Sequence, residues 1–276
     1  MTKNLQLLLL GAFTACARDS RAAPLRVGTT TTVSQSGALA VLDSLRAPVP
    51  VRVVIASSGQ ILHSAAAGDL DVVITHAPTL EQRLLIEPGH AALRCPFVAS
   101  RFAIVGPAAD PARVASAATA ADAFRRIAVS RSGFASRGDS SGTHVKELAL
   151  WTAAGVQPAA PGNTWYVQAG VDQAVTLRLA DERAAYALAD LPTFTRMQGL
   201  DSRVLFTADT ALGNPYTLYV IRSASENPDA TRFSRWAMAE WRVRLLALRL
   251  PTGDAAFVPL AGECSVPGAS PNDKKN

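Results

Sequence analysis

Residue types that would indicate a metal site or a catalytic centre are scarce in this sequence. Its 276 residues include 3 cysteines and 4 histidines, and none of these follow the Cys-x-x-Cys or His-x-x-x-His spacing of a metal site. Asp139, Ser141 and His144 crowd into one turn of chain, whereas the members of a catalytic triad usually come from separate elements. We therefore expect no resident metal, no cofactor and no catalytic residue.

Clusters of charge of one sign and long apolar runs are also missing. The net charge of +5 is spread over the chain, and no basic stretch is longer than two residues. A nucleic-acid-binding surface usually carries a basic stripe with interleaved aromatic residues, so we expect no nucleic-acid partner. The apolar run from Leu5 to Ala15 is too short to span a bilayer, and no later run is apolar enough.

The N-terminal run instead fits an export leader over residues 1–22. Lys3 precedes the run, as in the positively charged start of a secretory signal peptide. Phe13-Thr14-Ala15-Cys16 resembles the cleavage box of a bacterial lipoprotein, in which Cys16 becomes the lipidated first residue. Cleavage near Ala22-Ala23 is the alternative. Either way, we expect the protein on the periplasmic or extracytoplasmic face of the membrane.

Two cysteines remain after such processing, Cys95 and Cys264. Export permits a disulfide between them, which would fix the C-terminal segment. Two unpaired thiols are the alternative, because a sequence does not reveal whether the two Cα atoms lie within bonding range. From Gly262 onward, Pro, Gly, Ser, Asn and Lys dominate, and we expect residues 262–276 to be a disordered tail.

Short apolar strands alternate with helices along most of the chain. The predicted strands are residues 25–27, 51–55, 71–75 and 102–105, with helices at 37–45 and 61–67. This alternation predicts an α/β domain with a largely parallel sheet. Residues 127–206, beginning with a strand at 127–130, predict a second α/β lobe, followed by a strand at 216–221 and a helix at 230–250. We expect lobe I over 24–106 and 213–261, and lobe II over 107–212.

Three junctions between strand and helix are built from glycine and small hydroxyl residues. They are residues 28–37, which include four consecutive threonines, residues 57–59, and residues 136–143. In open α/β sheets such loops meet at the carboxyl ends of the strands, where ligands bind. Their backbone N–H groups and hydroxyls can donate hydrogen bonds to an anion. For each junction alone, plain helix capping is the alternative.

The third junction, Ser136-Arg137-Gly138-Asp139-Ser140-Ser141-Gly142-Thr143-His144, is the most informative. It runs directly into an amphipathic helix, whose first N–H groups are unpaired and whose dipole is positive at that end. Among the three junctions it alone carries a cation, Arg137, which can add charge-assisted hydrogen bonds. The stretch therefore predicts one side of a site for a small oxyanion.

In their order along the chain, these motifs resemble the tungstate-binding proteins of bacterial ABC transporters, over roughly residues 25–250. The Ser-Arg-Gly-Asp…Ser-Gly-Thr-His stretch is the most specific part of the resemblance. The other matching segments are Gly28 to Gly37, Ser58-Gly59-Gln60, Thr75-His76-Ala77-Pro78 with Glu81, Lys146-Glu147, Trp151, Trp165-Tyr166, Tyr186 and Asn214-Pro215-Tyr216.

The resemblance implies a two-lobed α/β fold of the periplasmic-binding-protein type 2, each lobe a mostly parallel sheet flanked by helices, with an oxyanion held between the lobes. Thr32 stands where the family commonly has serine, and Ser57-Ser58 where Gly-Thr is usual. The ligand contacts that the resemblance implies are Thr30, Thr31, Thr32, Ser58, Arg137, Ser141, Gly142 and Thr143.

Two segments depart from the family pattern. Gly170-Val171-Asp172-Gln173-Ala174 replaces a glycine-rich loop, and Leu191-Pro192 replaces an Arg-Gly pair. Lost glycines restrict the approach of the backbone to a ligand, and Asp172 would repel a dianion if it pointed inward. We expect a site adjusted to another oxyanion, or weaker binding by this lobe.

The sequence thus predicts an exported, monomeric solute-binding protein for tungstate or molybdate. It would deliver the anion to a membrane ABC permease with its ATPase, and its lobes would close by hinge motion. An exported oxyanion sensor or adaptor on the same fold, without transport, is one alternative. A periplasmic serine hydrolase is the other.

Overall fold

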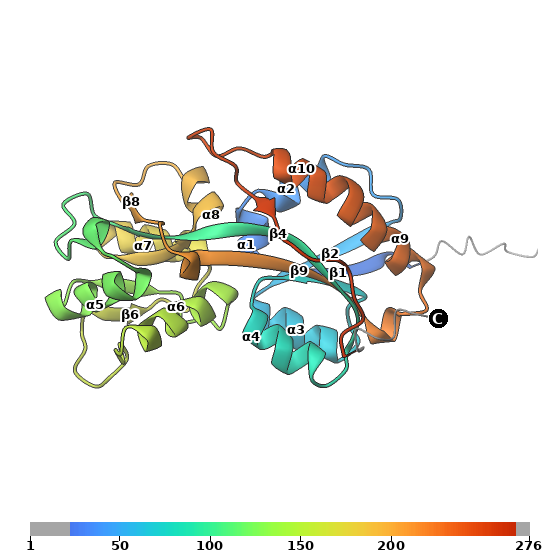
Figure 1. Cartoon of the computed structure of the whole chain (residues 1–276), viewed down its shortest axis with the longest axis horizontal. Coiled ribbons are helices and arrows are strands. Elements are labelled where there is room, and N and C mark those ends of the chain that lie inside the picture. The colour runs from blue at the N-terminus through green and yellow to red at the C-terminus, as the bar shows by residue number, and fades with distance from the viewer. Residues whose placement is uncertain (1–22, 269–276) are drawn as a thin grey trace, which may run out of the picture.

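The computed structural model describes residues 23–268, which form two lobes (Figure 1). The first lobe contains β1 (Leu25–Thr30), α1 (Thr31–Gln35), α2 (Ala38–Asp43), β2 (Val51–Ala56), α3 (Ser58–Ala66), β3 (Val72–Thr75), α4 (Pro78–Glu81), α9 (Pro228–Trp236) and α10 (Arg242–Ala247). The second contains α5 (Ala120–Ser130), β5 (Phe134–Ser136), α6 (Gly142–Ala153), β6 (Tyr166–Gln168), α7 (Gln173–Glu182), β7 (Ala187–Asp190), α8 (Leu191–Arg196) and β8 (Arg203–Phe206). The leader expected over residues 1–22, with Cys16, lies outside the described residues.

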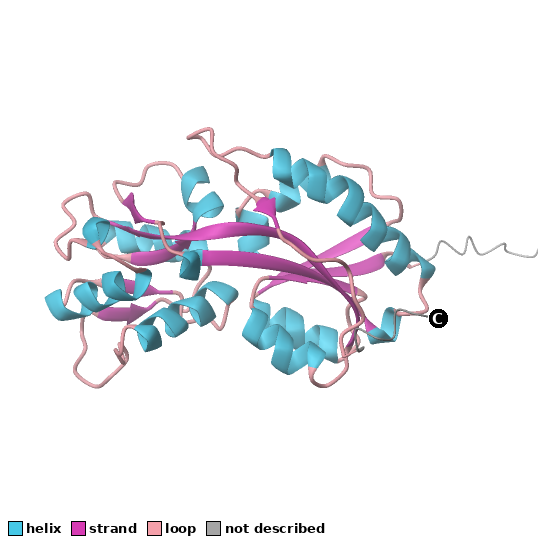
Figure 2. Ribbon diagram, in the orientation of Figure 1, coloured by secondary structure: helices cyan, strands magenta, loops and turns pink. Residues whose placement is uncertain are grey.

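Two long strands, β4 (Ala91–Gly106) and β9 (Gly213–Ile221), connect the lobes and run side by side (Figure 2). In the first lobe the strand order is β10-β4-β9-β3-β1-β2, where β10 is Val258–Pro259. β4 pairs with β9 as far as Arg101, and from Phe102 it pairs with β7 of the second lobe. The chain therefore passes from one sheet to the other at Arg101–Phe102.

The α/β fold class is confirmed, but the sheets are more antiparallel than the sequence predicted. β1 lies parallel to β2 and β3, and β5 lies parallel to β6. Within residues 23–268, every strand pair that involves β4 or β9 is antiparallel. One of these strands leaves the first lobe and the other returns, so they run in opposite directions and need no helical crossover.

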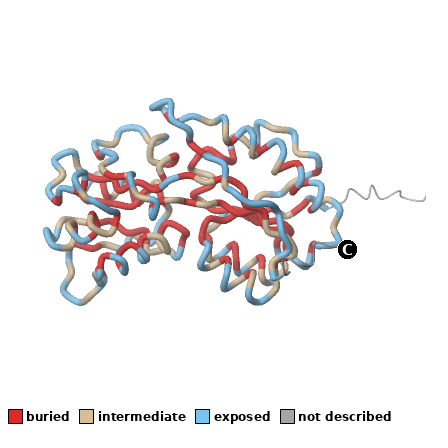
Figure 3. Tube along the Cα trace, in the orientation of Figure 1, coloured by how far each residue is buried: buried red, intermediate tan, exposed pale blue. Residues whose placement is uncertain are grey.

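Each lobe has its own apolar core, which fixes the strand ends from which the loops begin. In the first lobe Trp241 is fully buried, and its Nε1 donates to the carbonyl of Ala38 at 3.1 Å. In the second, the rings of Phe124 and Phe134 lie 4.4 and 5.1 Å from that of Trp151. The central strands are buried and the outer turns of the helices are exposed (Figure 3).

The strand predicted at residues 127–130 is wrong, because these residues form the end of α5. Phe124 and Ile127 lie at helical spacing and are both buried, so the apolar run belongs to a helix face. The strand that precedes the Ser136 to His144 stretch is β5, which has only 3 residues. So short a strand leaves almost no periodic signal in a sequence.

The C-terminal segment follows a defined path beyond Gly262, where the sequence predicted a disordered tail. Cys264 forms a disulfide with Cys95 of β4, which decides between the two alternatives that the sequence left open. Ser265 and Arg94 exchange two backbone hydrogen bonds of 2.8 Å. These bonds hold residues 262–268 beside β4, while residues 269–276 lie outside the described part of the chain.

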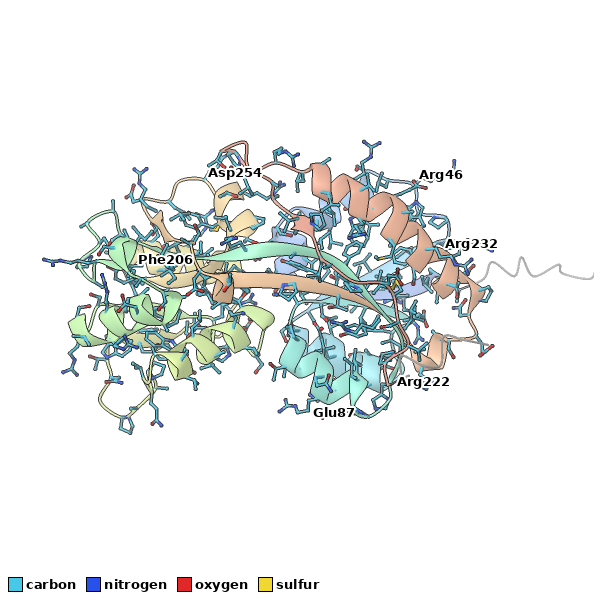
Figure 4. The ribbon with its side chains drawn as sticks, in the orientation of Figure 1. Arg46, Glu87, Phe206, Arg222, Arg232 and Asp254 are labelled. Carbon is cyan, nitrogen blue, oxygen red and sulfur yellow. A yellow bond between two sulfur atoms is a disulfide. The ribbon has the colours of Figure 1, made fainter. Side chains whose placement is uncertain are left out.

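Basic side chains are spread over the outer surface. Arg46, Arg222 and Arg232 are exposed and point outward from the first lobe in Figure 4. Arg232 pairs with Asp229 one turn earlier on α9, at 3.2 Å. Within residues 23–268, no helix is long and apolar enough to cross a membrane.

Candidate functional site

The three predicted loops meet where the two lobes face each other. β1 and β2 are parallel and pair Thr30 with Ala56, so the loops that follow these two strands begin side by side. The third loop follows β5 in the second lobe and leads into α6. A cleft of about 940 Å³ lies between the lobes, lined by Thr31 of the first and Arg137 of the second.

Arg137 reaches across from the second lobe, and its side chain is only 1% exposed. Nη1 donates to Thr32 Oγ1 at 3.1 Å, and Nη2 donates to Thr31 Oγ1 at 3.3 Å. Because both threonine hydroxyls accept from the guanidinium, their own hydrogens stay free to donate to a third group. Nε of Arg137 is buried and has no hydrogen-bond partner among the described residues.

The first turn of α6 supplies the second group of donors. The backbone N–H of Gly142 donates to Ser58 Oγ of the first lobe at 3.0 Å. Ser141 caps the helix, because its Oγ accepts from the backbone N–H of His144 at 3.2 Å. Thr143 Oγ1 is buried and unpartnered in the part of the chain that is described. Unpaired donors at a positive helix end are suited to an anion.

All the predicted site residues lie at this junction between the lobes. Three interlobe hydrogen bonds join five of them, two from Arg137 to Thr31 and Thr32 and one from Gly142 to Ser58. Thr30 caps α1 and Ser141 caps α6. These two residues therefore have the helix-capping role that the sequence offered as an alternative to anion binding. The buried members of the set are Thr30, Thr32, Ser58, Arg137, Ser141, Gly142 and Thr143.

Asp139 belongs to the same cluster, although the sequence reading gave it no role. Its carboxylate forms an ion pair with Nη2 of Arg137, and its Oδ1 accepts from the backbone N–H of Ser141 at 3.1 Å. Burial lowers the pKa of Arg137, and the charge of Asp139 acts in the opposite direction. Asp139 is thus an internal anion on one edge of the guanidinium. The signal in the sequence that could have indicated this role is the position of Asp139, an acidic residue two positions after Arg137.

The Gly170 to Ala174 segment contains a helix cap and also lines part of the cleft. Asp172 caps α7, because its Oδ1 accepts from the backbone N–H of Val175 at 3.0 Å. The backbone N–H of Ala174 donates to Gln35 Oε1 of the first lobe at 3.3 Å. One backbone N–H at the start of α7 is thus engaged by the first lobe, while Gly170, Val171 and Asp172 line the cleft. Gln35, which belongs to the first predicted junction, contributes a further contact between the lobes.

His76 packs behind the site, at the base of the connecting strands. Its Nδ1 lies 3.0 Å from Asn214 Oδ1, and its ring stacks on Tyr216 at 5.1 Å. Burial, assisted by the charge of Arg137, lowers the pKa of His76 to about 4, so the ring is neutral near pH 7. A Cβ at Gly142 would lie 2.7 Å from this ring and 2.8 Å from the carbonyl oxygen of His76. Only glycine fits there.

Gly138 to Gly142 has the Gly-x-Ser-x-Gly spacing of a hydrolase nucleophile, between a strand and a helix. Ser140 also has a left-handed φ of 58°. However, it contacts His144 through its backbone N–H, which donates to Nδ1 at 3.2 Å. A serine nucleophile needs a hydrogen bond from its hydroxyl to a base, and Ser140 Oγ makes no such bond within the described chain. His144 braces the loop instead.

The groups that meet at this junction are mostly hydrogen-bond donors, although the carboxylates of Asp139 and Asp172 also line the cleft. Hydroxyls, a guanidinium and helix N–H groups bind oxyanions, whereas a metal ion needs lone pairs from carboxylates, imidazoles or thiolates. Within residues 23–268, no group of three or more His, Cys, Asp or Glu side chains is arranged to hold a metal ion. The arrangement can bind an anion by charge-assisted and neutral hydrogen bonds together.

The chain is similar in sequence to known proteins. Residues 16–240 match the family model of the PBP superfamily domain. A putative ABC transporter anion-binding protein of Haloferax volcanii is 35% identical over 215 residues, which cover 75% of this chain and 62% of that protein. This chain therefore spans less than two thirds of that relative. The tungstate-binding protein TupA of Peptoclostridium acidaminophilum is 33% identical over 226 residues, which cover 78% of this chain and 77% of that protein.

A solved structure agrees with the sequence relatives. The tungstate ABC transporter structure from Geobacter sulfurreducens superposes with a TM-score of 0.68 at 35% identity, covering 80% of this chain and 96% of that one. The family model, the relatives and the shared fold lead to one conclusion. The chain belongs to the Tup-type family of substrate-binding proteins, which are binding proteins rather than enzymes and have the type 2 periplasmic-binding-protein fold.

Proposed function

We propose that the protein is the exported solute-binding component of an ABC transporter. It captures a tetrahedral oxyanion between its lobes and delivers it to a membrane permease with its ATPase. Tungstate is the ligand favoured by the relatives named above, and molybdate, with the same charge and shape, is the second candidate. The observation that carries the proposal is a pair of buried atoms without a hydrogen-bond partner among the described residues, Arg137 Nε on the third loop and Thr143 Oγ1 in the first turn of α6.

The proposal includes closure of the lobes around the ligand. Residues 24–106 and 213–261 form lobe I, and residues 107–212 form lobe II. Arg137, Gly142 and Ala174 of the second lobe all hydrogen-bond to groups of the first, so opening the cleft would break these contacts together. The strands β4 and β9 are the segments that bend.

The proposal also covers the export of the protein and its oligomeric state. Residues 1–22 act as the leader, and the mature protein is a monomer on the extracytoplasmic side. It is attached to lipid through Cys16, or released by cleavage near Ala22-Ala23. Mass spectrometry of the protein from a native membrane fraction distinguishes the two, because only lipidation makes Cys16 the first residue.

A thermal-shift panel of tungstate, molybdate, sulfate, phosphate and chromate tests the ligand class. A ligand that binds only the folded state at about 100 times its Kd stabilises it by about 2.7 kcal/mol. For a chain of this size we expect tungstate to raise Tm by about 5–10 °C. Sulfate and phosphate are expected to act weakly. A flat response to all five anions would contradict the proposal.

Gly142→Ala is expected to weaken oxyanion binding at least tenfold, because its Cβ would collide with the ring and backbone of His76 and hold the lobes apart. The collision involves a carbonyl oxygen, which cannot turn aside as a flexible side chain does. The fold itself should survive, since alanine favours a helix start more than glycine does. Calorimetry measures the affinity, and small-angle scattering measures the wider separation of the lobes.

Gly59→Ala is the matched control. Gly59 faces Ser140 across the same cleft, but its Cβ would meet the nearest atom at 3.6 Å, an ordinary contact. This variant should bind the anion as the wild type does. Equal affinities for the two variants would mean that His76 and Gly142 do not limit closure.

A further inference from the structure

Glu147 is a buried carboxylate directly beneath the loop that carries Arg137. It lies on α6 and is 1% exposed. Four donors surround it. Oε2 accepts from Ser136 Oγ at 2.8 Å, and Oε1 accepts from Tyr166 Oη at 2.8 Å and Trp151 Nε1 at 3.1 Å. The backbone N–H of Arg137 is the fourth donor. Glu147 thus holds the main chain of the residue that would contact the ligand.

The charge of Glu147 has no cationic counterpart. Among the ion pairs of residues 23–268, none involves Glu147, and the guanidinium of Arg137 is engaged by Asp139 and the two threonines. A buried charge without a partner is costly and is easily neutralised by a proton. A dianion bound at the start of α6 would place more negative charge on the same loop, which makes the ionised carboxylate still less favourable.

We propose that Glu147 takes up a proton when an oxyanion binds at Arg137, so that binding and protonation are coupled. The inference rests on the proposed function. The geometry permits the step, because a proton on Oε2 can be donated to Ser136 Oγ while the remaining lone pairs still accept from Arg137 and Trp151. Burial raises the pKa of Glu147 to about 7, so the proton is available from solvent near neutral pH.

Proton uptake by Glu147 must be distinguished from uptake by other titratable groups near the site. Tyr166 faces it from β6 and stays protonated, because burial raises the pKa of Tyr166 far above neutrality. His76 is buried in the first lobe, with its pKa at about 4. His144 lies on the first turn of α6 with its pKa lowered by burial, and it lines the cleft. His144 is therefore the competing proton acceptor.

The sign of the pH dependence follows from linkage. If the bound anion raises the pKa of Glu147, affinity is highest below the pKa of the free protein and falls as pH rises through the pKa of the complex. Each unit by which the bound anion raises the pKa of Glu147 corresponds to a tenfold change in Kd. We expect tungstate affinity to fall about tenfold between about pH 6 and pH 9, a range over which tungstate remains a dianion.

Calorimetric titration with tungstate in HEPES and in Tris measures the proton count, because the two buffers differ in ionisation enthalpy. The wild type should take up a fraction of a proton, at most one, near about pH 7.5. Glu147→Gln should bind with no uptake and no pH dependence, while His144→Gln should keep both. Uptake that vanishes in His144→Gln and persists in Glu147→Gln would overturn the inference.

A second variant covers the case in which Glu147→Gln does not fold. Tyr166→Phe removes one donor, so the pKa of Glu147 should rise and the window of proton uptake should move to higher pH. Tungstate binding by the wild type with no proton uptake at any pH would refute the coupling and leave the proposed function intact. A wild type that binds none of the five anions would instead refute the proposed function.

Discussion

Replacing Arg137 with alanine is expected to weaken tungstate binding about 100-fold or more. The guanidinium is the one cation of the three converging loops, and it is buried where charge-assisted hydrogen bonds are strong. A lost bond of this kind costs about 1.5–3 kcal/mol, and 1.4 kcal/mol corresponds to a factor of ten in Kd. The loss also leaves Asp139 unpaired beside the ligand. Calorimetry of both proteins at the same ionic strength measures the change.

Arg83→Ala is the matched control for charge. Arg83 lines the same cleft but is exposed, so its removal should change Kd by less than about threefold. Arg137→Lys keeps the positive charge but loses the planar guanidinium, so its Kd should lie between those of Arg137→Ala and Arg83→Ala. If Arg137→Ala binds tungstate as tightly as Arg83→Ala does, Arg137 does not contact the ligand.

Removal of the disulfide between Cys95 and Cys264 is expected to lower the free energy of unfolding by about 2–5 kcal/mol. The cross-link joins positions 169 residues apart, so it constrains most of the unfolded chain. In the folded state it holds the segment that contains β10 along β4, where Val258 pairs with Ala99. For a protein of this size the loss corresponds to a fall in Tm of roughly 5–15 °C, measured by calorimetry with and without reductant.

Single cysteine variants separate the cross-link from the packing of each side chain. Cys95→Ala, Cys264→Ala and the double variant should lose nearly the same stability, because any one of them removes the bond. Anion binding should persist in all three, since neither cysteine lines the cleft. A Tm that does not change on reduction would mean that the segment is held by its backbone pairs with β4 alone.

The parts of the site that sequence predicts well are those fixed by local chemistry. Glycine and hydroxyl residues at helix starts mark the loops, and parallel pairing of β1 and β2 brings two of these loops together. Arg137 follows as the one cation among them. The fold class followed from the alternation of strands and helices, together with the specific Ser136 to His144 stretch.

The parts that sequence misses depend on contacts between distant segments. The antiparallel pairing of β4 and β9 follows from their opposite courses between the lobes, which no local pattern records. Gln35 contacts Ala174 from 139 residues away, and although both lie in segments that the sequence singles out, no local pattern pairs them. The sequence left open whether Asp172 points inward, and in the structure it both caps α7 and lines the cleft. The path of residues 262–268 depends on a disulfide to a residue far earlier in the chain.

A crystal structure of the protein soaked with tungstate tests the central claim most directly, because tungsten gives a strong anomalous signal. We expect one tungsten peak at the junction between the lobes, with oxygens about 2.7–3.2 Å from Arg137 Nε, Thr143 Oγ1 and the hydroxyls of Thr31 and Thr32. A peak elsewhere, or no peak at saturating tungstate, would contradict the account.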